Sequence, residues 1–200
     1  MQPPKPDYAG DTEHDVPNLN LPNALTLIRL LLVPVFAFLL PQSQESAQIR
    51  WWATFVFGIA ALTDLIDGYL ARKYQLITNV GKIADPIADK LLIGTALIAL
   101  SLEGTSSWWF TIVILAREIA ITLLRFKVIN RGVIPASRGG KAKTISQMVA
   151  ILAYLVPLSG WIDSLAAVAM WTAVLLTIVT GIDYVVRAYR LPVLPETSTR

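Results

Sequence analysis

Four aspartates in the sequence have the spacing and the surroundings of a site for divalent metal ions. Asp64 and Asp67 are three residues apart, and Asp85 and Asp89 are four apart, so each pair would share one face of a helix. Both pairs lie in or beside strongly apolar runs, where ionisable groups are costly and usually functional. Four carboxylates provide the hard oxygen ligands that suit Mg²⁺ or Mn²⁺. We call these residues the aspartate cluster and expect it to hold two metal ions, a recurrent arrangement for displacement at phosphorus.

Small and cationic residues lie close to the aspartates. Gly68, Ala71 and Gly81 would let a bulky ligand approach the backbone, and Arg72 is a cation that suits a phosphate. Buried acids that serve packing alone would not need this pattern. A divalent-cation channel or carrier also uses acids within the membrane and is the alternative from a different class, although it does not explain the glycines, the alanine and the arginine.

The composition limits both the fold and the chemistry. Hydrophobic residues make up 54% of the chain and charged residues 16%, and the mean hydropathy is +0.56. These values indicate a polytopic membrane protein. The absence of cysteine excludes disulfides, thiolate ligands and a cysteine nucleophile. The single histidine, His14, lies in a polar N-terminal stretch, so carboxylates are the groups left for catalysis.

Six apolar runs predict an all-α protein with six transmembrane helices. Basic residues gather in the links after the second and fourth runs and near the C-terminus, while the other links hold only Arg50. This bias predicts that both termini lie in the cytoplasm. We expect a flexible cytoplasmic tail over residues 1–19, a membrane domain over 20–190 and a C-terminal tail over 191–200. The apolar runs span residues 24–40, 51–69, 83–102, 108–128, 144–158 and 165–186.

The first run has a polar stripe formed by Asn23, Thr26 and Arg29. Asn23 follows Pro22, and we expect it to cap the helix. Arg29 has two interpretations. Its side chain either extends to the membrane surface or forms part of a polar edge that faces the aspartate cluster.

Four features separate or interrupt the later runs. The turn over residues 73–80 contains Thr78, which could hydrogen-bond a phosphate or a ribose. Pro86 is expected in the first turn of the third helix, where proline is tolerated. The neighbours Arg117 and Glu118 interrupt the fourth run, and a self-neutralising structural pair is one interpretation of them. The basic loop over residues 131–143 either cradles a phosphate or simply faces anionic lipid.

The cluster and its neighbours resemble the signature of the CDP-alcohol phosphatidyltransferases. All eight signature positions are filled, and the resemblance covers roughly residues 21–190. It implies an integral membrane enzyme that transfers a phosphatidyl group from a CDP-linked lipid such as CDP-diacylglycerol to an alcohol and releases CMP. The pattern is Asp64-x2-Asp67-Gly68-x2-Ala71-Arg72-x8-Gly81-x3-Asp85-x3-Asp89.

The resemblance also implies a role for each residue. Asp64, Asp67 and Asp85 would bind metal, and Asp89 would both face a metal and act as the general base. The displacement would be direct, with a carboxylate nucleophile as the alternative. A homodimer in the cell (inner) membrane, with its active site facing the cytoplasm, is the implied assembly. The CDP-lipid site would contain Asn23, Thr26, Gly68, Ala71, Arg72, Thr78 and Gly81.

Two further stretches bear on the acceptor alcohol. AREIAITLLR, which contains Arg117 and Arg125, and GKAKT, which contains Lys141 and Lys143, resemble those of family members that use glycerol 3-phosphate. These four cations would bind the acceptor's phosphate. CDP-dependent cardiolipin synthases have a small residue where this chain has Lys143, which argues against phosphatidylglycerol as the acceptor. Inositol phosphate remains an alternative because it also needs a basic pocket.

Overall fold

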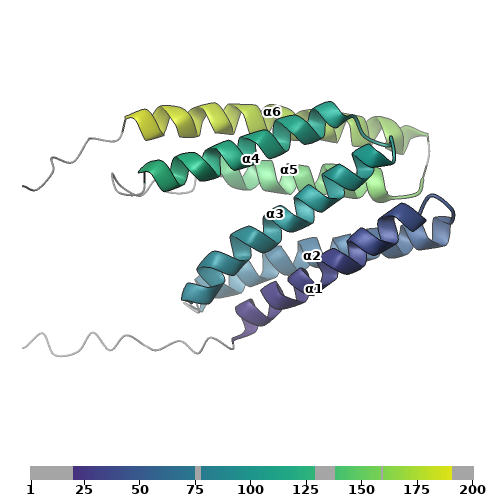
Figure 1. Cartoon of the computed structure of the whole chain (residues 1–200), viewed down its shortest axis with the longest axis horizontal. Helices are drawn as coiled ribbons and strands as arrows, with labels where there is room; N and C mark the ends of the chain where they lie inside the picture. The colour runs from purple at the N-terminus through teal and green to yellow at the C-terminus, as the bar shows by residue number, and fades with distance from the viewer. Residues whose placement is uncertain (1–19, 75–77, 129–137, 159, 191–200) are drawn as a thin grey trace, which may run out of the picture.

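The structure is a computed structural model that describes residues 20–74, 78–128, 138–158 and 160–190 (Figure 1). The predicted tails over residues 1–19 and 191–200 lie outside the described residues, as does the first part of the predicted basic loop. Each predicted apolar run forms an α-helix. The helices are α1 (Leu21–Gln42), α2 (Ala47–Lys73), α3 (Asn79–Leu102), α4 (Trp108–Val128), α5 (Arg138–Leu155) and α6 (Trp161–Tyr189).

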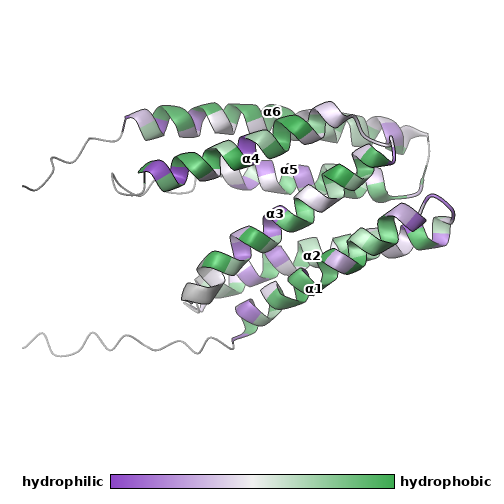
Figure 2. Cartoon of the chain, in the orientation of Figure 1, coloured by the Kyte–Doolittle hydropathy of each residue, from purple (hydrophilic) through white to green (hydrophobic). Residues whose placement is uncertain are grey.

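The helices have the surface of a membrane protein. Within the described residues, three segments are long and apolar enough to cross a bilayer: Leu21–Gln42, Ala47–Ala71 and Trp161–Tyr189. Figure 2 shows hydrophobic residues along much of every helix, with hydrophilic residues interrupting α3 and α4. Large apolar side chains such as Phe38, Leu123 and Trp171 are exposed on the outside. An outer face of this kind fits lipid, and the chain is an all-helical membrane protein.

The packing order brings distant parts of the sequence together. Helix α1 packs against α2 and α3, and α6 packs against α4 and α5. Contacts of α2 with α5 and of α3 with α4 join these groups. Figure 1 shows the start of α1, the end of α2, the start of α3 and the end of α6 at one end of the molecule. The buried core includes Phe36, Phe57, Leu97, Ile114 and Ile151, and it lies between the helices that carry the aspartates and those that carry the basic residues.

The start of α1 differs from the prediction. Helix α1 begins at Leu21, and its N-cap is Asn20, whose Oδ1 accepts a hydrogen bond from the backbone N–H of Asn23 at 3.0 Å. The prediction that Asn23 caps the helix is therefore wrong. Because the helix begins earlier, the amide side chain of Asn23 does not cap α1. It contacts Thr78, the N-cap of α3, instead.

Helices α2, α3, α5 and α6 also begin earlier than predicted. Helix α3 begins at Asn79, so Pro86 lies inside it and not in the first turn as we expected. There it removes one backbone hydrogen bond. Helix α5 begins at Arg138, so residues 138–143 of the predicted basic loop are helical. Lys143, in the second turn of α5, donates a hydrogen bond to Glu118 of α4.

Candidate active site

The aspartate cluster forms because α1 lies against both of the helices that carry it. Thr26 of α1 lies between the two pairs: its hydroxyl oxygen is 2.5 Å from Asp85 Oδ1 and 3.4 Å from Asp67 Oδ2. Asp64 lies close enough to Asp67 and to Asp89 to repel both carboxylates. The two pairs, predicted from spacing on separate helices, are thus brought into one region.

Arg29 is the main counter-ion of the cluster. Its side chain is 0% exposed, and its Nη1 lies 2.5 Å from Asp64 Oδ1. Its Nη2 is in close contact with Asp67 Oδ2. The interpretation of the first run as a polar edge that faces the aspartates is confirmed, and the alternative of an arginine at the membrane surface is wrong. A buried charge of this kind is stable only when it is paired.

The donor set fits a hard divalent cation. Asp89 Oδ1 is buried and accepts no hydrogen bond from the described part of the chain, which leaves a carboxylate oxygen for a metal or a hydroxyl. Across residues 20–74, 78–128, 138–158 and 160–190, no three Asp, Glu or His side chains form a ready metal site. Arg29 pairs with two of the four carboxylates. Oxygen ligands of this number and charge suit Mg²⁺ or Mn²⁺.

A second group of predicted residues joins the start of α1 to the start of α3. The Asn23 side-chain amide donates to Thr78 Oγ1 at 2.7 Å, and Thr78 Oγ1 accepts the Gly81 N–H at 3.0 Å as the N-cap of α3. A Cβ atom on Gly81 would lie only 2.7 Å from Asn23 Oδ1. Glycine is therefore required for this approach. Gly68 and Ala71 are half-buried on α2, and the side chain of Arg72 lies outside the described residues.

A cavity of about 210 Å³ opens beside the aspartate cluster. We call it the Asp89 cavity. It lies between α3, α4 and α5, and Asp89 is the cluster residue that lines it. Its wall combines a carboxylate of the cluster with two lysines, a glutamate and apolar side chains. The lining residues are Asp89, Lys90, Ile93, Leu115, Glu118, Ile119, Lys143 and Gln147.

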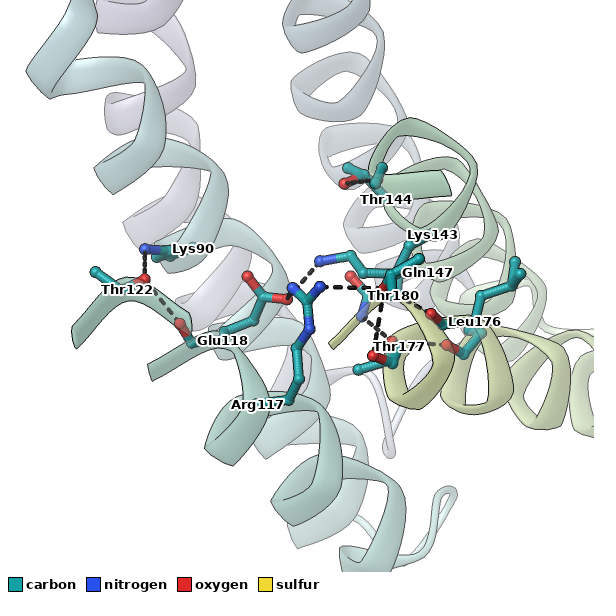
Figure 3. Close-up of polar contacts among 12 residues, drawn as sticks. Lys90, Arg117, Glu118, Thr122, Lys143, Thr144, Gln147, Leu176, Thr177 and Thr180 are labelled. Carbon is teal, nitrogen blue, oxygen red and sulfur yellow. Dashed lines mark hydrogen bonds and ion pairs between the residues drawn. The ribbon is translucent and has the colours of Figure 1, made fainter. Parts of the chain in front are cut away.

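Glu118 organises the polar wall of this cavity (Figure 3). Its Oε1 accepts a hydrogen bond from Arg117 Nη1 at 3.0 Å and a short one from Lys143 Nζ. Arg117 Nη2 also donates to Thr180 Oγ1 on α6 at 3.1 Å. On the opposite side, Lys90 Nζ donates to Thr122 Oγ1 at 2.5 Å. The Arg117–Glu118 pair is therefore not a self-contained pair, because it also includes a lysine from α5.

The four predicted acceptor cations fall into two groups. Lys143 is buried in the wall of the Asp89 cavity, and Arg117 reaches that wall through Glu118. Arg125 is exposed and lies over the Tyr184 ring at 5.8 Å from its centroid. Lys141 is exposed on the first turn of α5. The structure places Lys143 at the cavity and Arg117 behind Glu118 in its wall, and it brings neither Arg125 nor Lys141 there.

Several residues of the cavity were not among the predicted site residues. Lys90, Glu118 and Gln147 line it. One signal pointed to Glu118, because it is the only glutamate inside a predicted transmembrane run. Its contact with Lys143 spans 25 residues and could not be inferred from local spacing.

The fold and the site together define a class: a helical membrane protein in which a buried acidic cluster adjoins a cavity with basic residues. The family model for CDP-alcohol phosphatidyltransferase matches residues 19–179. The chain belongs to this family, as its signature indicated.

Curated relatives cover most of the chain. It is 52% identical to the "Probable phosphatidylglycerophosphate synthase" of Mycobacterium tuberculosis (strain H37Rv), over 86% of this chain and 82% of the relative. It is 40% identical to the "CDP-diacylglycerol--glycerol-3-phosphate 3-phosphatidyltransferase" of Bacillus subtilis (strain 168), over 82% of this chain and 93% of that protein. A Rickettsia felis protein with the same name is 38% identical, over 82% of this chain and 93% of its own length.

Proposed function

We propose that this protein transfers the phosphatidyl group of CDP-diacylglycerol to glycerol 3-phosphate, giving phosphatidylglycerophosphate and CMP. The names of the relatives support this reaction and this pair of substrates. One structural observation supports it most: the predicted general base, Asp89, lines the same cavity as the predicted phosphate-binding residue Lys143. An acceptor bound there would have its hydroxyl near a carboxylate and its phosphate near an ammonium group.

The aspartate cluster would hold the metal ions. Asp64, Asp67, Asp85 and Asp89 would bind two Mg²⁺ or Mn²⁺ ions, whose charge would stabilise the leaving diphosphate oxygen. Arg29 fixes two of these carboxylates from the α1 side. The CDP-lipid would lie against the polar start of α1 and the α2–α3 junction. The residues proposed to contact it are Asn23, Thr26, Gly68, Ala71, Arg72, Thr78 and Gly81.

Asp89 would act on the acceptor. Its Oδ1 accepts no hydrogen bond from the described residues and would take the proton of the primary hydroxyl. The oxygen then attacks the lipid phosphorus as the bond to CMP breaks. Lys143 would bind the acceptor's phosphate directly, and Arg117 would act through Glu118. Arg125 and Lys141, both exposed, would attract the dianion toward the cavity at longer range.

The proposal includes an orientation in the membrane. Six membrane spans, with both termini in the cytoplasm, would put the aspartate cluster near the cytoplasmic face of the inner membrane. The distribution of lysine and arginine supports this orientation. Glycerol 3-phosphate is water-soluble and would reach the cavity from that side. A homodimer is part of the proposal through the family resemblance.

An acceptor panel tests the function. Purified protein in lipid nanodiscs would be given CDP-diacylglycerol, Mg²⁺ or Mn²⁺ and one acceptor at a time, and CMP release would be measured. We expect glycerol 3-phosphate to give the highest rate. A higher rate with inositol phosphate or phosphatidylglycerol would refute the choice of acceptor within the family. Divalent-metal flux into liposomes without CMP release would favour the channel alternative.

A further inference from the structure

Glu118 is a partly buried acid for which the proposed reaction has no direct use. It lines the Asp89 cavity, and its side chain is 19% exposed. Both of its cationic partners, Arg117 and Lys143, contact the same oxygen, Oε1. Within the described residues, the hydrogen bonds to the Glu118 carboxylate end on Oε1, and Oε2 is not among the buried atoms that lack a partner. Figure 3 shows the two cations on one side of the carboxylate.

Binding of a phosphate alone does not explain this carboxylate. Glu118 places a negative charge in a wall that also contains Lys90 and Lys143, and that charge would repel a dianionic phosphate. A hydroxyl group, by contrast, donates a strong hydrogen bond to a carboxylate. The proposed acceptor carries two hydroxyl groups besides its phosphate. Asp89 would take the proton of the reacting hydroxyl. The other hydroxyl needs a hydrogen-bond acceptor in the same cavity.

We propose that Glu118 selects the acceptor by binding the secondary hydroxyl of glycerol 3-phosphate through Oε2. Its Oε1 meanwhile holds the Lys143 ammonium group in the wall of the cavity. Glu118 is thus a specificity-determining residue that also positions Lys143. The inference rests on the proposed function and names the feature of the substrate that the site recognises.

The contacts around Glu118 hold its carboxylate in one orientation. Arg117 donates to Glu118 and to Thr180, so α4 and α6 together hold the carboxylate. The arginine lies directly on Gly181, where an added Cβ would be 3.2 Å from Arg117 Cγ and 3.3 Å from Nε. Arg117 does not line the Asp89 cavity. It therefore acts on the acceptor through Glu118 and not by contact with the phosphate.

The test compares two acceptors on one enzyme preparation. Propane-1,3-diol monophosphate has the phosphate and the reacting hydroxyl of glycerol 3-phosphate but lacks the secondary hydroxyl. The ratio of kcat/KM for the two acceptors is independent of the fraction of folded enzyme. We expect the wild type to prefer glycerol 3-phosphate roughly ten- to a hundredfold. Glu118→Gln should reduce this preference severalfold, and Glu118→Ala should reduce it to less than about threefold.

The matched control is Asp183→Asn, which removes an exposed carboxylate on α6 and should leave the preference unchanged. An equal loss of activity on both acceptors in Glu118→Gln and Glu118→Ala would mean that Glu118 is only structural, and would overturn the inference. A wild type that uses both acceptors equally well would also overturn it. In these two cases the proposed function survives, whereas failure of the wild type to release CMP with either acceptor would refute the proposed function itself.

Discussion

At the scale of single residues, the site depends on one buried guanidinium. Arg29 is completely buried and contacts Asp64 and Asp67, and Asp67 is itself only 4% exposed. Like charges at this depth would repel each other without a cation between them. Arg29 therefore stabilises the buried carboxylates of Asp64 and Asp67 before any metal binds.

Replacing Arg29 tests this role. Arg29→Gln leaves two carboxylates without their counter-ion, and removal of one partner from a buried ion pair costs about 3–5 kcal/mol. We expect a lower thermal unfolding temperature in detergent, and a larger increase in that temperature on adding Mg²⁺ than the wild type shows, because the ion supplies the missing charge. Arg29→Lys should be intermediate because an ammonium group cannot bridge both aspartates in the same way. A glutamine variant as stable as the wild type, with or without Mg²⁺, would contradict this account.

Gly81 gives a second prediction at this scale. In Gly81→Ala the new Cβ would meet Asn23 Oδ1 at 2.7 Å, so the α1–α3 contact must open. We expect the KM for CDP-diacylglycerol to rise while the KM for glycerol 3-phosphate changes much less. The control is Gly94→Ala on the same helix, where the Cβ would be 3.6 Å from Leu115 Cδ2, an ordinary contact. Equal effects of the two substitutions would show that Gly81 has no special role.

At the scale of helices, the end of the bundle opposite the site is held by Arg50. Its guanidinium is 2.6 Å from Glu103 Oε2 and 3.1 Å from Ser43 Oγ. It also donates to the Leu155 and Tyr154 carbonyl oxygens at 3.1 and 3.0 Å. These are among the last carbonyls of α5, which have no partner within the helix. One side chain on α2 thus joins the ends of α3 and α5.

Arg50→Ala should therefore destabilise the bundle without affecting substrate binding. We expect a loss of about 3–5 kcal/mol, typical of a broken buried ion pair, and KM values for both substrates within about twofold of the wild type. The comparison is Arg187→Ala, which breaks an exposed pair with Asp183 one helical turn away and should cost no more than about 0.5 kcal/mol. Thermal unfolding in one detergent would measure both. Equal unfolding temperatures for the Arg50→Ala and Arg187→Ala variants would show that Arg50 does not have this structural role.

At the scale of the whole molecule, the features that could be predicted from the sequence are those that depend on local sequence pattern. All six helices followed from apolar runs, and the two aspartate pairs followed from helical spacing within the signature. Every helix except α4 begins three to six residues before its predicted apolar run, because the apolar pattern does not mark the polar residues with which these helices start. Asn20 and Thr78 act as caps, and Lys143 meets Glu118 across 25 residues. The roles of Glu118 and Lys90 depend on how α3, α4 and α5 pack, which no local pattern gives.

The orientation in the membrane is a prediction about the whole chain. Lysine and arginine lie mainly after the second, fourth and sixth runs, so we expect both termini and the 131–143 segment in the cytoplasm. Cysteine substitutions at single positions would measure this, because the chain has no native cysteine and each new thiol can be labelled by an impermeant reagent. Labelling of the 131–143 segment from outside intact cells would contradict this orientation.

The central claim is that the Asp89 cavity binds the acceptor, and the KM for glycerol 3-phosphate in Lys143→Met tests it most directly. Charge-assisted contacts to a phosphate contribute roughly 1.5–3 kcal/mol each, so this KM should rise about ten- to a hundredfold. The KM for CDP-diacylglycerol should stay near the wild-type value. Lys141→Met removes the same charge from an exposed position two residues away and should raise the KM for glycerol 3-phosphate much less. If the KM values for both substrates rise together in Lys143→Met, or if Lys141→Met has the larger effect, the cavity is not the acceptor site.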